Sequence, residues 1–163
     1  MKSREWNGLH NEARAIIEQF QNDLPVSLSA IAGGLDLSVK AATLAPGISG
    51  EIRPAADGKY VIRVNRHDVR KRQRFTVAHE IAHYLLHRDK IGDGIEDDVL
   101  YRSGLSSAIE AEANRLAADI LMPWLKVVEL REEAKEIGVG DEVLYMAEQF
   151  GVSEAAMRIK LGL

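Results

Sequence analysis

The chain contains no cysteine among its 163 residues. Disulfide bonds and thiolate metal sites are therefore excluded, so any bound metal ion must be held by histidine and carboxylate side chains. A chain without cysteine also fits a reducing compartment.

Long hydrophobic runs are missing as well. No stretch approaches the roughly 20 apolar residues that are needed to cross a bilayer. The N-terminal segment MKSREWNGLH lacks the apolar centre of a signal peptide. We therefore expect a cytoplasmic protein.

Neither sign of charge dominates, because the formal net charge is only −4. This balance argues against a protein whose whole surface binds nucleic acid. With 46% hydrophobic and 28% charged residues, the chain suits one globular domain with a single core over residues 1–163. We expect no room for a separate helix-turn-helix or sensor domain.

Hydrophobic periodicity predicts an α+β fold that is mostly helical. Helices are expected over residues 3–21, 28–33, 69–88 and 108–122, with two or three more at the C-terminal end. Strands are expected over residues 39–44, 49–53 and 59–65. The domain then divides into N-terminal helices and a small three-stranded sheet (1–68), two central helices (69–123) and C-terminal helices (124–163).

The stretch FTVAHEIAHYLLH at residues 75–87 carries the strongest chemical signal. His79 and His83 are four residues apart, so on a helix their side chains project side by side and can reach one cation. Glu80 lies beside that pair. Two imidazoles with an adjacent glutamate suit a zinc hydrolase, in which Glu80 is the general base that takes a proton from water.

Two histidines at this spacing also occur on helices by chance. The other positions of the segment are largely apolar: Phe75, Ala78, Ile81, Ala82, Leu85 and Leu86. The helix is therefore expected to be buried, with its histidine edge at the core. Polar groups at such an edge need partners, and a metal ion would supply one.

A third ligand must come from elsewhere in the chain. Asp89 stands where the longer HExxHxxGxxH motif places its last ligand, but that motif needs a glycine and the chain has Leu86. His87 is two turns from His79, about 12 Å along the axis, which is too far to share a tetrahedral ion. We interpret His87 as a residue that lines the cleft or supports a ligand.

The helix in EAEANRLAADILMP offers a better candidate. Its periodicity turns Glu110 towards the apolar face and turns Glu112, Arg115 and Asp119 towards solvent. Glu110 is therefore our candidate for the third ligand, and replacing Glu112 is expected to leave metal binding intact.

Two further roles are open on this helix. Ser107 and Glu110 fit an S-x-x-E capping box, which would use Glu110 only to satisfy amides at the helix end. Asn114, one turn beyond Glu110, could hold a ligand imidazole through a hydrogen bond.

The segments RQRFTVAHEIAHYLLH, EAEANRLAADILMP and AEQFGVSEAAMRIKLGL together resemble the ImmA/IrrE-type metallopeptidases. The resemblance implies a gluzincin-like fold, with a small sheet beside the HExxH helix. It places His79, His83 and Glu110 as ligands of Zn²⁺ and Glu80 as the catalytic residue. Manganese or iron also fits two histidines and one carboxylate.

The same resemblance implies a function. Proteins of this kind cleave repressors or antitoxins in phage, mobile-element and stress-response systems, so the expected partner is a helix-turn-helix repressor or antitoxin. The alternative is a binding module that has kept the fold without catalysis.

Two other segments have competing interpretations. The C-terminal segment, with a turn at Gly151 and a cap at Ser153, is arranged like a helix-turn-helix. Four carboxylates against two basic residues in 141–163 argue against direct nucleic-acid binding. The basic segment Arg63–Arg74 is interpreted either as a solvated turn with packed stems or as an approach for an acidic partner.

The substrate must also be aligned and its developing oxyanion stabilised. We expect the strand at Tyr60–Asn65 to lie at the edge of the cleft, where an extended peptide could pair with it. Tyr101 is our candidate for the catalytic oxyanion donor, with His87 and Arg102 as alternatives.

Overall fold

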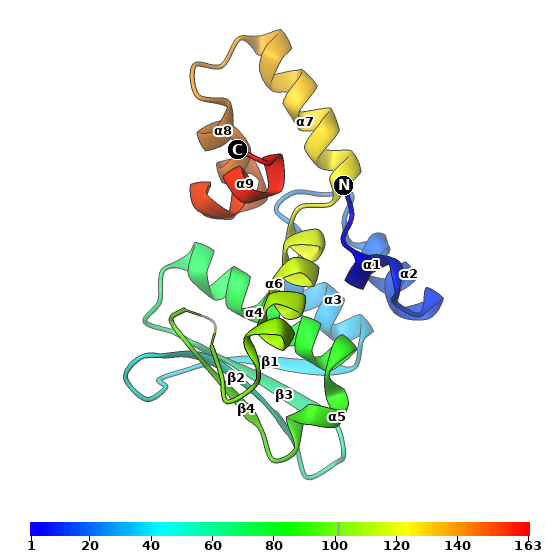
Figure 1. Cartoon of the computed structure of the whole chain (residues 1–163), viewed down its shortest axis with the longest axis vertical. Helices are drawn as coiled ribbons and strands as arrows, with labels where there is room; N and C mark the ends of the chain where they lie inside the picture. The colour runs from blue at the N-terminus through cyan, green and yellow to red at the C-terminus, as the bar shows by residue number, and fades with distance from the viewer. Residues whose placement is uncertain (101) are drawn as a thin grey trace.

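The computed structural model describes residues 1–100 and 102–163. It is an α+β arrangement in which a sheet lies at one end, two crossed helices lie in the middle and three helices lie at the other end (Figure 1). The central helices are α4 (Arg70–Leu86) and α6 (Ser107–Leu121), which pack closely against each other. These two helices carry the HExxH motif and Glu110.

The described residues form one mixed sheet of four strands: β1 (Leu37–Ala42), β2 (Ile48–Pro54), β3 (Tyr60–Asn65) and β4 (Ile95–Asp98). The strand order is β1-β3-β2-β4, with β1 parallel to β3 and the other neighbours antiparallel. The prediction of three strands is therefore wrong. β4 escaped notice because it has only four residues, three of them acidic, and so lacks the β-branched and aromatic pattern of a strand.

The strand order also corrects the expected position of the substrate edge. β3 lies between β1 and β2, so both of its backbone edges are already paired. The free edges belong to β1 and β4. The strand Tyr60–Asn65 therefore cannot accept an extended peptide, and β4 is the edge that follows β2.

Helix α4 lies against β2 and β3, and its residues Thr76 to His83 are buried. Gly50 on β2 makes this close approach possible. A Cβ atom at Gly50 would lie 2.3 Å from Thr76 Cγ2 and 3.8 Å from Glu80 Cγ. Helix α5 (Arg88–Ile91) follows α4 after a break at His87, so the single helix predicted over residues 69–88 ends earlier.

The N-terminal segment forms two helices where one was predicted. α1 (Arg4–Asn7) and α2 (Asn11–Gln19) are separated at Gly8, and the break lets Trp6 and Leu9 both reach the core. α3 (Leu28–Gly34) begins at Ser27, whose hydroxyl accepts a hydrogen bond from the amide of Ala30.

Residues 124–163, all of them described, form α7 (Trp124–Ile137), α8 (Glu142–Phe150) and α9 (Glu154–Leu161). Each ends at a glycine in the left-handed conformation. Ser153 caps α9, as predicted, because its hydroxyl accepts from the amide of Ala156. Lys160 at the end of α9 pairs with buried Asp119 of α6, which fixes the last helix to the centre of the molecule.

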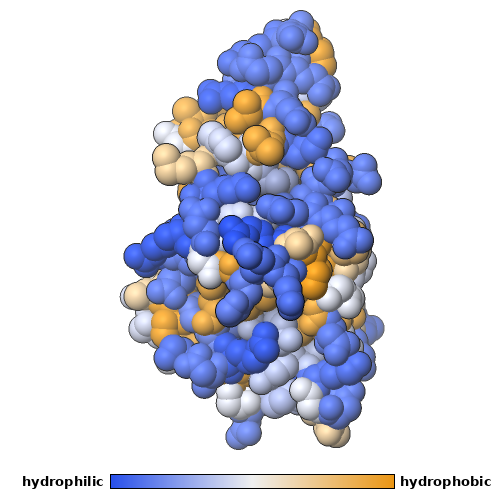
Figure 2. Space-filling model, turned by 90° about the vertical axis from the view of Figure 1, so that its right-hand side faces the viewer, coloured by the Kyte–Doolittle hydropathy of each residue, from blue (hydrophilic) through white to orange (hydrophobic). Residues whose placement is uncertain are grey.

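The surface is mostly hydrophilic on the face shown in Figure 2, where hydrophobic residues form separate small patches. Among the described residues, no helix has the length and apolar character that crossing a bilayer requires.

Candidate metal centre

His79 and His83 lie one turn apart on α4 and are both fully buried. Their Nε2 atoms are 3.1 Å apart. Asn114 of α6 lies on the other side of His79, with its Oδ1 atom 2.8 Å from His79 Nδ1. Because Asn114 Oδ1 can only accept, Nδ1 of His79 donates, and in a neutral imidazole this leaves the Nε2 lone pair facing His83. The predicted contact of Asn114 with a histidine is confirmed.

Glu110 points into the same space from α6, with 5% of its surface exposed. Its two oxygens lie 3.1 Å from His79 Nε2 and 3.3 Å from His83 Nε2. Ser103 Oγ donates a hydrogen bond to Glu110 Oε1 at 2.8 Å. The carboxylate is thus oriented towards both imidazoles.

The capping-box alternative for Glu110 is wrong. Helix α6 is capped by Ser106, whose hydroxyl accepts from the amide of Ile109 at 3.3 Å. Glu110 is therefore one position beyond the residue that would complete the box.

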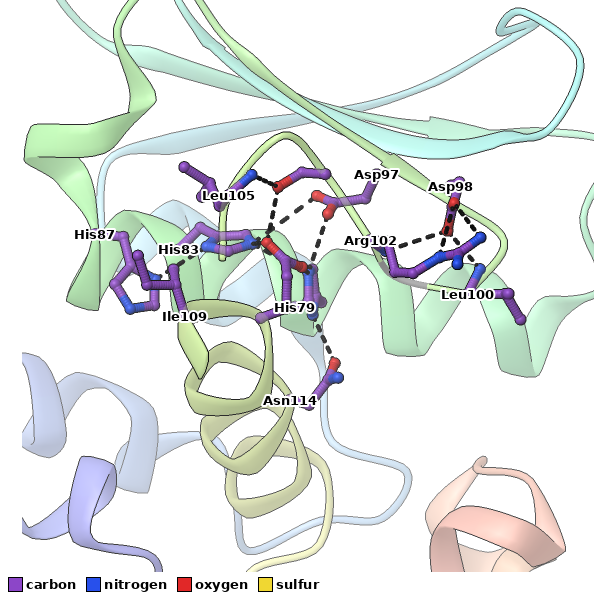
Figure 3. A network of polar contacts seen from close by, with 12 residues as sticks. His79, His83, His87, Asp97, Asp98, Leu100, Arg102, Leu105, Ile109 and Asn114 are labelled. Atoms are coloured by element: carbon purple, nitrogen blue, oxygen red, sulfur yellow. Dashed lines mark hydrogen bonds and ion pairs between the residues drawn. The ribbon is translucent and has the colours of Figure 1, made fainter. Parts of the chain in front are cut away.

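Asp97 is a site residue that was missed in the sequence. It comes from β4 and is fully buried, with Oδ1 3.4 Å from His79 Nε2 and Oδ2 4.0 Å from His83 Nε2 (Figure 3). One ligand atom from each of His79, His83, Asp97 and Glu110 falls within 4.8 Å of the others. The alternation along β4, which buries Ile95 and Asp97 and exposes Glu96, is the pattern that could have identified Asp97 in the sequence.

Glu80 lies beside this group and is also fully buried. Its carboxyl group adjoins that of Asp97. Burial raises the pKa of Glu80 well above its usual range, and the carboxylates of Asp97 and Glu110 raise it further. Glu80 is therefore a carboxylate whose environment favours holding a proton.

Opposite pKa shifts affect the other members of the group. Burial alone would lower the pKa of His79, but its contacts with Asp97 and Glu110 outweigh burial and raise the pKa to about 9. Burial would raise the pKa of Glu110, but hydrogen bonds with His79 and His83 lower it below its usual range. Three buried carboxylates with two imidazoles therefore form an environment that favours a cation.

His87 is connected to His83 in a way the sequence only partly indicated. Its Nδ1 atom lies 3.0 Å from His83 Nδ1, and its Nε2 atom lies 2.8 Å from Glu112 Oε2. Glu112 was expected to face solvent only, yet it is one third exposed and holds His87. Glu112, His87 and His83 thus form a chain of contacts that ends at the centre.

Asp89 and Arg102 lie outside the group. Asp89 is exposed on α5, and Arg102 is mostly exposed and pairs with Asp98 at 3.2 Å. Tyr101, the candidate oxyanion donor, lies outside the described residues. Asp119 was expected to face solvent, but it is buried because Lys160 and the amide of Ser3 contact it.

The basic segment Arg63–Arg74 is engaged with the protein itself. Arg63 pairs with Glu51, Lys71 pairs with Glu148, and Arg74 donates to the carbonyl of Val26. These contacts favour the interpretation of a packed turn over that of a free basic surface.

Two hollows adjoin the centre. One of about 300 Å³ is lined by residues of α6, including Glu110 and Asn114, and by the segment before α6, including Ser103 and Leu105. A second of about 610 Å³ shares Leu100 and Asn114 with the first and is mainly apolar. A peptide segment could therefore approach the centre along these surfaces.

An α+β scaffold that buries two histidines of an HExxH helix against a glutamate of the next long helix is metallopeptidase-like. The chain belongs to the family of IrrE N-terminal-like domains, peptidase M78, whose sequence profile matches residues 41–162. This confirms the predicted resemblance.

A Mycobacterium tuberculosis transcriptional regulator is similar in fold, with a TM-score of 0.54 and 19% sequence identity. The similarity covers 96% of this chain and 48% of that chain, so this chain spans about half of the regulator's length. No curated protein matches the chain.

Proposed function

We propose that the protein is a zinc-dependent metallo-endopeptidase that acts in the cytoplasm on a protein substrate. The observation that carries the proposal is the convergence of His79, His83 and Glu110 from two helices, with the buried carboxylate of Glu80 beside them. Membership of the M78 peptidase family supports the same chemistry.

The residues present fit a zinc ion. Two ligand atoms on a tetrahedral zinc with bonds of about 2.0–2.1 Å are separated by roughly 3.3 Å. The three contacts among His79 Nε2, His83 Nε2 and the Glu110 oxygens are 3.1, 3.1 and 3.3 Å. His79, His83 and Glu110 would therefore hold the metal with little rearrangement.

A zinc ion in this place would supply a Lewis acid that polarises the peptide carbonyl and acidifies water. Glu80 takes a proton from the attacking water as the bond from oxygen to the carbonyl carbon forms. Glu80 would then deliver that proton to the leaving nitrogen as the carbon–nitrogen bond breaks, which leaves its carboxylate ready for the next water. Asn114 keeps the imidazole of His79 in one tautomer throughout.

The substrate proposed is a DNA-binding repressor or antitoxin of a phage, mobile-element or stress-response system. The resemblance to ImmA/IrrE-type proteins supports this class, and a fold neighbour described as a transcriptional regulator is compatible with it. The second candidate is a regulatory binding module without catalysis. The burial of all the candidate ligands supports this second candidate, because a substrate would have to reach an enclosed centre.

The edge strand β4 is the proposed site of substrate alignment, in place of the strand predicted from the sequence. Among the described strands β4 pairs with β2 alone, although the amide of Asp98 at its end donates to the carbonyl of Arg102, and it carries Asp97 next to the histidines. An extended peptide that paired with its free edge would run beside the centre.

Metal analysis tests the site. The purified protein should bind about one equivalent of zinc, and His79→Ala, His83→Ala or Glu110→Ala should each weaken binding by at least tenfold. Glu136→Ala is the control, because Glu136 is exposed on α7. Parent-like zinc binding in the Glu110 variant would contradict its assignment as a ligand.

Glu80→Gln distinguishes the peptidase from the binding module. The amide keeps the shape of the side chain but cannot act as a general base, so hydrolysis of a candidate repressor or antitoxin should fall by at least 100-fold. Zinc content and substrate affinity should stay close to those of the parent. A folded, zinc-loaded Glu80→Gln protein that cleaves at the parent rate would reject the peptidase proposal.

A further inference from the structure

Asp97 has a position that the proposed three-ligand site does not explain. The strand alternation of β4 directs Ile95 and Asp97 inwards and leaves Glu96 exposed. The Asp97 side chain is fully buried, and its oxygens face the ionisable side chains of the centre: His79, His83 and Glu80. A buried carboxylate is costly unless a cation or a proton accompanies it.

The location of Asp97 fits the same cation as the histidines. Asp97 Oδ1 lies 3.4 Å from His79 Nε2, close to the separation of about 3.3 Å between two ligands of one tetrahedral zinc, and Oδ2 lies 4.0 Å from His83 Nε2, so a small movement of the carboxylate would complete the set. Glu110, by comparison, also receives a hydrogen bond from Ser103. Figure 3 shows the Asp97 side chain directed at both imidazoles from the sheet side, opposite α6.

We propose that Asp97 is a fourth protein ligand, which closes the metal site in this conformation of the chain. This inference rests on the proposed zinc site and extends it. Four protein ligands are typical of structural zinc sites, whereas a catalytic site keeps one position open. The protein in this conformation is therefore a latent peptidase, and Asp97 must leave before substrate can reach the metal.

The position of Asp97 in the sheet makes such a movement feasible. β4 is a four-residue edge strand, hydrogen-bonded to β2 on one side. Its register with β2 shifts between Ile48 and Gly50, next to the pair that Gly50 forms with Asp97. Irregular edge pairing is cheaper to disturb than pairing within a sheet. A substrate strand that binds to β4 would act on the element that carries the closing ligand.

Metal affinity provides the first test. Zinc affinity is measured by competition with a chelator for the parent, Asp97→Ala, Asp97→Asn and Glu96→Ala. Both Asp97 variants should bind zinc at least tenfold more weakly, while Glu96→Ala, a change on the exposed face of the same strand, should match the parent. Circular dichroism of each metal-free protein shows whether it has folded. Asp97→Asn keeps the shape of the side chain, so it provides the test if Asp97→Ala does not fold.

Access to the metal provides the second test. In the cobalt-substituted protein, the visible spectrum reports binding of acetohydroxamate, a small ligand that needs an open metal position. Asp97→Ala should bind acetohydroxamate at least tenfold more tightly than the parent does, because the closing ligand is gone.

The outcomes separate this inference from the proposed function. Zinc affinities of both Asp97 variants within twofold of the parent would overturn the inference. The effect of Asp97 on the pKa of Glu80 would then be its remaining role. Weaker zinc binding with unchanged acetohydroxamate affinity would overturn closure of the site. Zinc binding that survives His83→Ala and Glu110→Ala would instead remove the proposed three-ligand site itself.

Discussion

At the scale of single residues, His87 shows how a side chain too distant to bind the metal can control a ligand. If His83 Nε2 is to bind zinc, His83 Nδ1 must carry the proton and donate to His87 Nδ1. His87 then presents its Nε2–H to the Glu112 carboxylate. Binding of the metal by His83 Nε2 therefore sets the direction of both hydrogen bonds in the series His83–His87–Glu112.

The contacts of Glu112 replace the expectation that its loss leaves metal binding intact: we now predict that Glu112→Ala weakens zinc binding by about tenfold, although Glu112 does not contact the metal position. Loss of the carboxylate frees His87 to turn, and His83 loses its fixed tautomer. His87→Phe should have an effect of similar size, because it removes the acceptor for His83 Nδ1. Chelator competition measures both, and wild-type affinity in both variants would show that the chain is unimportant.

Some of these residues were accessible from the sequence and others were not. The spacing of His79 and His83 on a helix predicted that they lie side by side, and the periodicity of the next helix turned Glu110 towards them. The structure places Glu110 within 3.3 Å of both imidazoles, while its role as a ligand stays a prediction. Asp97 was not predicted because its strand is short and acidic, and its partners lie on other elements. Glu112 was misplaced because a helical wheel describes one helix and ignores His87, which lies at the break between α4 and α5.

At the scale of elements, the distance between α4 and the sheet depends on Gly50. The absence of a side chain there lets Thr76 approach β2, and the same approach places Glu80 against the strand. Periodicity predicted both elements within a few residues, but it contains no information on how closely they pack. The role of Gly50 therefore appears only in the structure.

We predict that Gly50→Ala destabilises the protein by about 1–3 kcal/mol, because the new methyl group overlaps Thr76 and must push α4 away. The shift should also displace Glu80 and reduce hydrolysis beyond the loss explained by unfolding. Gly104→Ala is the matched control, since no atom lies within 4 Å of a Cβ built there. Urea unfolding measures the difference, and equal stability of the two variants would contradict this account of the packing.

At the scale of the whole molecule, ion pairs connect segments that are far apart in the sequence. Arg115 of α6 donates two hydrogen bonds to Glu5 of α1, at 2.6 and 3.0 Å. Lys160 of α9 pairs with Asp119 of the same helix α6. Helix α6 thus holds both the first and the last helix while carrying Glu110 and Asn114 to the centre. Such long-range pairs were beyond prediction, because side-chain partners that are 110 and 41 residues apart leave no local pattern.

The pair of Glu5 and Arg115 predicts a dependence of stability on pH. The hydrogen bonds from Arg115 lower the pKa of Glu5 from 4.5 to about 2, against the opposing effect of burial. A carboxylate whose pKa is lower in the folded state stabilises the protein fully above its unfolded pKa, and that stabilisation is lost as the pH falls towards the folded pKa. A shift of this size corresponds to at most about 3 kcal/mol, and we expect on the order of 1–2 kcal/mol because Arg115 is partly exposed.

The measurement compares metal-free parent and Arg115→Met proteins by urea unfolding at several pH values, so that release of zinc in acid does not contribute. The parent should lose more stability than the variant between about pH 5 and pH 2, because only the parent has the strongly lowered pKa of Glu5. Glu5→Gln should also flatten this part of the profile, since it removes the titrating group. Parallel profiles for all three proteins would show that this pair does not contribute to the acid stability of the fold.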